Sequence, residues 1–135
     1  MRYNRVFERR GYRLATLRAS LTNVSRTARQ WGLPVALRVQ SQILSKYTLP
    51  QIHDDEGYYL VGRIALLIDA VLLGRLPRRL VSHGRYLGFK LKLTAQHRRN
   101  DTPEILELEV VVGPCDGRRP AAYVWRVEPL DSPPF

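Results

Sequence analysis

The chain has 135 residues, 44% of them hydrophobic, which suits one domain with a buried core; we expect that domain over residues 1–129 and a proline-rich tail over 130–135. Its formal net charge of +10 favours a polyanionic partner such as nucleic acid. Cys115 is the only cysteine, which excludes an internal disulfide and a cysteine-based metal site and favours a reducing, cytoplasmic location. The N-terminal MRYNRVFERRGYR is too charged for a signal peptide.

The positive charge is concentrated in the N-terminal part of the chain. In residues 1–50, ten Arg and Lys residues stand against a single acid, Glu8. This asymmetry favours a surface that contacts phosphates. Because 19 of the 22 basic residues are Arg, GC-rich coding alone is an alternative explanation of the charge.

The first predicted elements lie in TNVSRTARQWGLPVALRVQSQI, residues 22–43. Ser25 is placed to cap a short helix over residues 26–31, and Gly32 is placed to end it in the left-handed conformation. The segment therefore begins like a helix-turn-helix motif.

A second short helix is expected over residues 35–47, with Pro34 in its first turn. A helix that reads DNA bases in this motif turns apolar residues inward at the positions of Arg38 and Ser41. Both residues are polar here, so the sequence argues against a base-reading helix-turn-helix.

The longest apolar run, YYLVGRIALLIDAVLL, predicts a helix over residues 57–73. Gly74 and Pro77 supply its end. Because the run carries Arg63 and Asp69 and is too short to span a bilayer, we expect a buried helix. Its apolar residues recur at helical spacing: Leu60, Val61, Ile64, Leu67, Ile68, Val71 and Leu72.

Three later segments alternate between apolar and polar residues and predict strands over residues 86–95, 105–112 and 122–128. The expected fold class is α+β, a three-stranded antiparallel meander with one face covered by the long helix over 57–73. The two short helices precede this layer in the sequence.

Charge fixes the expected register of the first hairpin. Pairing Lys92 with Glu107 places Lys90 opposite Glu109 and keeps the apolar residues of both strands on the other face. Both patterns agree on this register.

The second hairpin is expected to pair Val110 with Trp125. This register sets Glu109 opposite Arg126 and turns Tyr123 and Trp125 to the buried face. Lys90, Glu109 and Arg126 would then form a row of alternating charge across three strands.

The meander brings several Arg-containing loops to one end of the sheet, where the strand over residues 86–95 begins. Arg presents a fork of hydrogen-bond donors that fits phosphate oxygens, so these loops form a candidate phosphate-binding surface. A solvated loop end is the alternative. Arg98 and Arg99 are expected at the opposite end. The candidate nucleic-acid-binding residues are Arg78, Arg79, Arg85, Arg118 and Arg119, with Arg10, Arg13 and Arg18 from the N-terminal segment.

No motif predicts catalysis, a metal or a cofactor. The HDDE stretch, residues 53–56, suits an acidic helix start, since consecutive residues cannot all converge on one ion. The adjacent Ser82 and His83 do not suit a nucleophile–base pair. Asp69 within an apolar helix and Cys115 in a turn are the remaining candidates, and each also has a plain structural explanation.

The chain also resembles an uncharacterised family of small proteins carried on bacterial plasmids, phages and integrated elements. The resemblance covers residues 12–129 and includes VSRTARQWGLPVAL, the DDEGYYLVGRIALLIDAVLL helix and the GPCDGRRP turn. The chain departs from that family's pattern at RASLTN, where the family is acidic, and in the Arg residues of the turn. The resemblance implies a mobile-element accessory protein and transfers no catalytic role.

These observations predict a non-enzymatic accessory protein of a mobile element that binds DNA, RNA or a nucleoprotein through its Arg residues, largely at phosphates. The alternative is a protein-binding inhibitor of a host defence or replication factor. A small hydrolase or nuclease that uses Asp69 or the HDDE acids is a third possibility.

Overall fold

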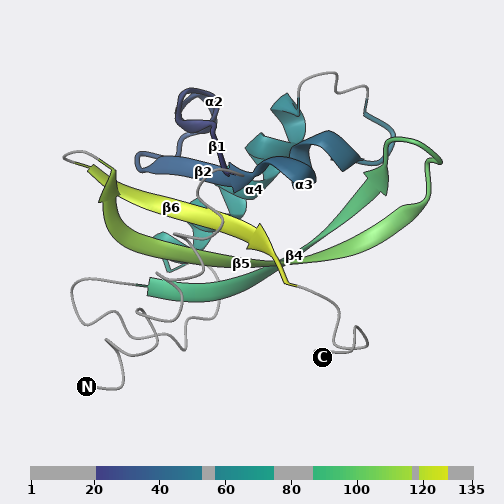
Figure 1. Cartoon of the computed structure of the whole chain (residues 1–135). Coiled ribbons are helices and arrows are strands. Elements are labelled where there is room, and N and C mark those ends of the chain that lie inside the picture. The colour runs from purple at the N-terminus through teal and green to yellow at the C-terminus, as the bar shows by residue number, and fades with distance from the viewer. Residues whose placement is uncertain (1–20, 53–56, 75–86, 117–118, 128–135) are drawn as a thin grey trace.

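The computed structural model describes residues 21–52, 57–74, 87–116 and 119–127. Over these residues the chain forms a six-stranded mixed sheet, with strand order β1-β2-β6-β5-β4-β3, that curls into a half-barrel (Figure 1). Three helices accompany it. In chain order the elements are β1 (Leu21–Asn23), α2 (Ser25–Gln30), β2 (Ala36–Gln40), α3 (Ser41–Lys46), β3 (Tyr47–Thr48), α4 (Tyr58–Leu72), β4 (Leu87–His97), β5 (Pro103–Asp116) and β6 (Arg119–Arg126).

The predicted fold class is wrong in the extent and connectivity of the sheet. The meander β4-β5-β6 exists, but β3 adds to one side of it and β2 and β1 to the other. β2 runs parallel to β6, from Ala36 opposite Ala121 to Val39 opposite Val124. The N-terminal half therefore contributes strands to the sheet, where two short helices were expected.

The first hairpin has the predicted register. Lys92 lies opposite Glu107 and Lys90 opposite Glu109 in the β4–β5 ladder. The Lys90 Nζ is 3.9 Å from a Glu107 carboxylate oxygen, a diagonal contact between exposed side chains. Such exposed pairs specify the register more than they stabilise the fold.

The predicted register of the second hairpin is wrong by one residue over most of its length. Val110 lies opposite Val124, and Glu109 lies opposite Trp125. At the end of the ladder, Asp116 lies opposite Arg119 in the expected register. If this pairing continued along both strands, it would give the predicted pairs. An irregularity between Val112 and Cys115 shifts the ladder by one residue and turns alternate β6 side chains to the opposite face.

The helix expected over 26–31 is confirmed as α2, and Gly32 follows it with φ of 96°. Ser25 does not cap this helix: its hydroxyl oxygen accepts a hydrogen bond from the Leu37 N–H at 2.9 Å and so ties α2 to β2. The helix expected over 35–47 is wrong in its first half, because residues 36–40 form β2. With a strand in place of the second helix, this segment is not a helix-turn-helix.

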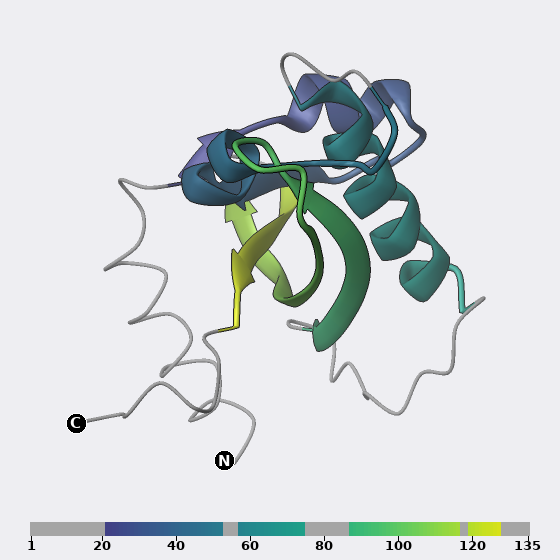
Figure 2. The same ribbon diagram turned by 90° about the vertical axis from the view of Figure 1, so that its right-hand side faces the viewer.

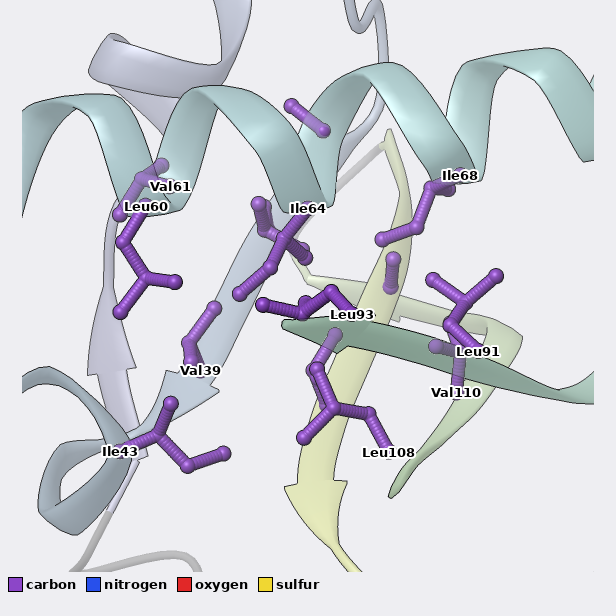
Figure 3. Packing of buried hydrophobic residues seen from close by; sticks show 14 of the residues in the cluster. Val39, Ile43, Leu60, Val61, Ile64, Ile68, Leu91, Leu93, Leu108 and Val110 are labelled. Carbon is purple, nitrogen blue, oxygen red and sulfur yellow. The ribbon is translucent and has the colours of Figure 1, made fainter. Parts of the chain in front are cut away.

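The long apolar helix is confirmed as α4, which packs across one face of the sheet (Figure 2). Ile64 and Ile68 point from α4 toward Leu91, Leu93 and the neighbouring strands (Figure 3). All of these side chains are buried and belong to one cluster. Removal of this apolar surface from water is the main favourable contribution to folding.

The other face of the sheet carries a second, smaller apolar cluster. Trp125 and Val111 are buried there, and Leu21 and Tyr123 pack against them. The sequence predicted Trp125 on the same face as the long helix. The shift in the β5–β6 ladder places Ala122 and Val124 on that face instead.

Candidate functional site

Most of the predicted nucleic-acid-binding residues lie outside the described residues. Arg119 begins β6, and only its backbone is described. The predicted separation of the two loop ends is confirmed, since Arg98 and Arg99 follow β4 at the opposite end of the β5 strand. Those outside are Arg10, Arg13, Arg18, Arg78, Arg79, Arg85 and Arg118.

A basic group that the sequence did not single out is formed at the β4–β5 hairpin; we name Lys46, Arg98 and Arg99 the hairpin tip. The Arg98 N–H donates to the Lys46 carbonyl at 2.8 Å, so segments about 50 residues apart in the sequence meet there. Lys46 and Arg99 are exposed. Among the described residues, none of the three cations forms an ion pair with a carboxylate.

A polar network beside the hairpin tip joins β3, β5 and β6. The Tyr47 hydroxyl donates to Glu104 Oε2 at 2.8 Å and accepts from Arg126 Nη1 at 3.0 Å. Arg126 Nη2 donates to Glu104 Oε1 at 2.6 Å. Because its three members come from different strands, the network holds the curl of the sheet at this end.

The network also fixes the base of the hairpin tip. Arg98 Nε donates to the Tyr47 carbonyl at 3.1 Å, and the His97 ring packs edge-on against the Tyr47 ring. Arg126 already neutralises Glu104. Asp101, whose carboxylate accepts from Gln96 Nε2 at 2.9 Å, is then the one described acid in the hairpin loop, against the three cations of the tip. The tip can therefore attract an anion.

The pKa of Tyr47 is raised, first by burial and then by its hydrogen bond to Glu104. We expect the free energy of unfolding to fall as the pH rises above about 10, because the unfolded chain then loses this proton more readily than the folded one. Below that pH the contribution is complete. Tyr47→Phe should flatten the fall and, through the lost hydrogen bond, cost about 0.5–1.5 kcal/mol at neutral pH. Urea unfolding of both proteins between pH 8 and 11 measures the two effects; parallel curves would contradict the assignment.

A cleft of about 340 Å³ opens between β4 and α4. The cation-bearing residues at its wall are Arg63 of α4 and Lys92 of β4, and the rest of the lining is mainly apolar. The sequence did not predict this cleft, which forms where β3 leaves the sheet after Thr48. Its lining residues are Leu49, Pro50, Ile52, Arg63, Leu67, Lys92, Leu93 and Thr94.

The candidates for catalysis do not assemble into a site within the described residues. Asp69 is half-buried on α4, and no group of three metal-ligating side chains occurs in the part of the chain that the structure describes. His53, Ser82 and His83 lie outside it, as does the side chain of Cys115. Nor is any described helix long and apolar enough to cross a membrane.

The sequence signals for these surfaces are weak. Tyr47, Glu104 and Arg126 are unremarkable in the sequence, and only the register of three strands brings them together. The resemblance to mobile-element proteins stays a prediction. Comparison with known proteins gave no match to the chain among family models, curated proteins or solved structures.

Proposed function

We propose that the protein is a non-enzymatic nucleic-acid-binding protein that contacts phosphates through Arg and Lys side chains. The observation that carries the proposal is the hairpin tip, where Lys46, Arg98 and Arg99 meet beside a carboxylate that Arg126 already neutralises. The net charge of +10 supports the same partner. Contacts of this kind position a protein on a nucleic acid without reading its bases.

The arginines predicted at the other end of the sheet belong to this proposal as a second candidate surface. Arg119 begins β6 and Arg118 precedes it in the sequence, whereas the hairpin tip lies beyond the far end of β5. A chain with cations at both ends of the sheet can contact phosphates of one long nucleic acid or of two. As an accessory protein of a mobile element, it would act on the element's DNA or RNA or on a nucleoprotein.

A salt titration tests the proposal. We expect micromolar binding of a mixed-sequence DNA or RNA oligonucleotide at about 50 mM salt, with affinity that falls steeply as salt rises. Fluorescence anisotropy measures it. Absence of binding at that salt concentration would contradict the function.

Paired variants distinguish the two ends of the sheet. Lys46→Ala with Arg99→Ala removes two exposed cations from the hairpin tip, and Arg118→Ala with Arg119→Ala removes two cations from the sequence between β5 and β6. The matched control is Arg26→Ala with Arg29→Ala, which removes two exposed cations from α2. We expect the tip variant to reduce the salt slope by about 1–2, since each lost phosphate contact reduces it by about 1. An equal loss in the α2 control would overturn the assignment to the tip.

The protein-binding alternative is favoured by a different observation. Within the part of the chain that the structure describes, β4 has an open backbone edge beside the cleft, and a nucleic-acid backbone lacks the row of hydrogen-bond donors that such an edge needs. A host defence or replication factor is the partner class that the sequence suggested.

A further inference from the structure

Among the described residues, one side of β4 lacks a partner strand over most of its length. β5 pairs with β4 from Leu87 to Gln96, whereas β3 pairs with it only at Gln96 and His97. Within the described ranges, no strand lies against residues 88–95 on the β3 side. At about 3.4 Å per residue, this open edge is about 27 Å long.

The hydrogen bonds at the hairpin show which backbone groups face the open edge. The Arg98 N–H bonds to Lys46 on the β3 side, and the His97 N–H bonds to Thr102 on the β5 side. Pro103, which has no N–H, lies opposite Gln96. In an antiparallel ladder the direction alternates residue by residue. The N–H and C=O groups of Lys90, Lys92 and Thr94 therefore point to the open edge.

The cleft lies along this edge. Lys92 and Thr94 form one wall, and Arg63 and Leu67 of α4, which runs next to β4 (Figure 2), form another. The segment after β3 closes one end, because Pro50 and then Gln51, with φ of 62°, turn the chain away from β4. Within the described ranges, no strand fills the position that β3 vacates, so another extended strand can be added there.

The charges at the cleft select among possible occupants. Arg63 and Lys92 form no ion pair with any described residue. A second copy of β4 would bring Lys against Lys, which disfavours edge-to-edge pairing of two copies. A nucleic-acid backbone offers acceptors but no regular row of donors for the Lys92 and Thr94 carbonyls. An acidic peptide offers both donors and carboxylates.

We propose that the β4 edge binds an extended segment of a partner protein by strand addition, with carboxylates at alternate positions of the segment. Backbone hydrogen bonds to Lys92 and Thr94 supply the attachment, as in other complexes where a peptide extends a sheet. Lys92 favours the acidic side chains on its own face of the sheet, while Leu67, the apolar lining and Arg63 on the α4 side lie against the side chains between them. This site is independent of the hairpin tip.

The probe is a fluorescein-labelled peptide, TVEVEVT, with TVKVKVT as its charge-reversed control. Anisotropy with the full chain should show saturable binding of the Glu peptide at least about fivefold tighter than the Lys peptide, and Lys92→Glu should reverse that preference. Equal binding of both peptides would overturn the charge assignment.

A backbone test separates strand addition from simple charge attraction. Thr94→Pro removes an N–H at the open edge without removing one from the β4–β5 ladder, whereas Thr94→Val keeps it. We expect about tenfold weaker peptide binding for the Pro variant and a change within about twofold for Val. Equal affinity of the two variants would overturn strand addition.

Two further measurements keep the result independent of folding and of nucleic acid. The first uses peptides that are N-methylated at all even or at all odd positions, so the protein itself stays unchanged. Only the set whose N–H groups point to β4 should abolish binding when it is methylated. Equal loss of binding with both peptides would contradict the proposal. The second is competition with an oligonucleotide. If the oligonucleotide displaces the peptide, and if Thr94→Pro weakens oligonucleotide binding as well, the cleft binds nucleic acid instead of a peptide. Oligonucleotide binding that Thr94→Pro leaves intact keeps the hairpin tip and the cleft distinct.

Discussion

Replacing Ile64 by Ala is expected to lower the free energy of unfolding by about 2–5 kcal/mol. Ile64 is completely buried on α4 and points into the main cluster between the helix and the sheet (Figure 3). The substitution removes three carbon atoms from a close-packed interior that can collapse only in part around the space. Such a loss is a large fraction of the stability of an ordinary domain.

Urea or thermal unfolding, followed by circular dichroism, measures this effect. Leu66→Ala is the matched control, because Leu66 lies on the same helix and is 45% exposed. We expect the control to change the free energy of unfolding by less than about 1 kcal/mol. A similar loss at both positions would contradict the packing of α4 against the sheet.

Gly62→Ala is expected to destabilise the protein, although Ala is a better helix former than Gly. A Cβ at position 62 would stand 2.3 Å from Trp31 Cε2, far inside contact distance. The indole has little freedom to move, since its ring packs against those of Tyr58 and Tyr59. We expect a net loss of about 1–3 kcal/mol, because overpacking outweighs the gain in helix propensity.

A double-mutant cycle with Trp31→Ala isolates the clash. The indole supplies the three atoms nearest to that Cβ. Without it, the Gly62→Ala change should become neutral or stabilising by up to about 1 kcal/mol. Chemical denaturation of the four proteins gives the coupling energy. If the two substitutions change the free energy of unfolding additively, a clash with Trp31 is not the reason that position 62 requires glycine.

The elements that the sequence predicted well are those set by local patterns. α4 follows from apolar residues at helical spacing, and the β4–β5 register follows from Lys92 opposite Glu107 with apolar residues on the other face. Both patterns involve neighbouring segments. A shift by one residue would have buried a charge, so the correct register was strongly favoured.

The second hairpin was predicted less well because its ladder is not continuous. Pairing outward from Asp116 and Arg119 leads to the expected register, and the shift between Val112 and Cys115 breaks it. Gly113 lies within this irregularity, but a Gly-Pro pair there is equally typical of a turn. The result is that Arg126 lies beside Tyr47 and Glu104, where an exposed charge row was expected.

β2 was missed because its partner is distant in the sequence. Residues 36–40 hold only two buried residues, Leu37 and Val39, and Pro34 just before them suits a helix start equally well. The strand is stabilised by its parallel pairing with β6. No local pattern predicts such pairing, and the same holds for the hairpin tip, which depends on where β3 meets β4.

The position of β6 has a consequence for biosynthesis. This strand is the last of the six in the chain, yet it lies between β2 and β5 in the interior of the sheet. During translation, β2 and β1 cannot join β5, β4 and β3 until β6 has left the ribosome exit tunnel. Assembly of the complete sheet is therefore expected to follow the synthesis of β6, because pairing over such a sequence separation is slow to form. A nascent chain that ends before residue 119 would expose the edges of β2 and β5 that β6 covers in the complete sheet, and such edges promote aggregation.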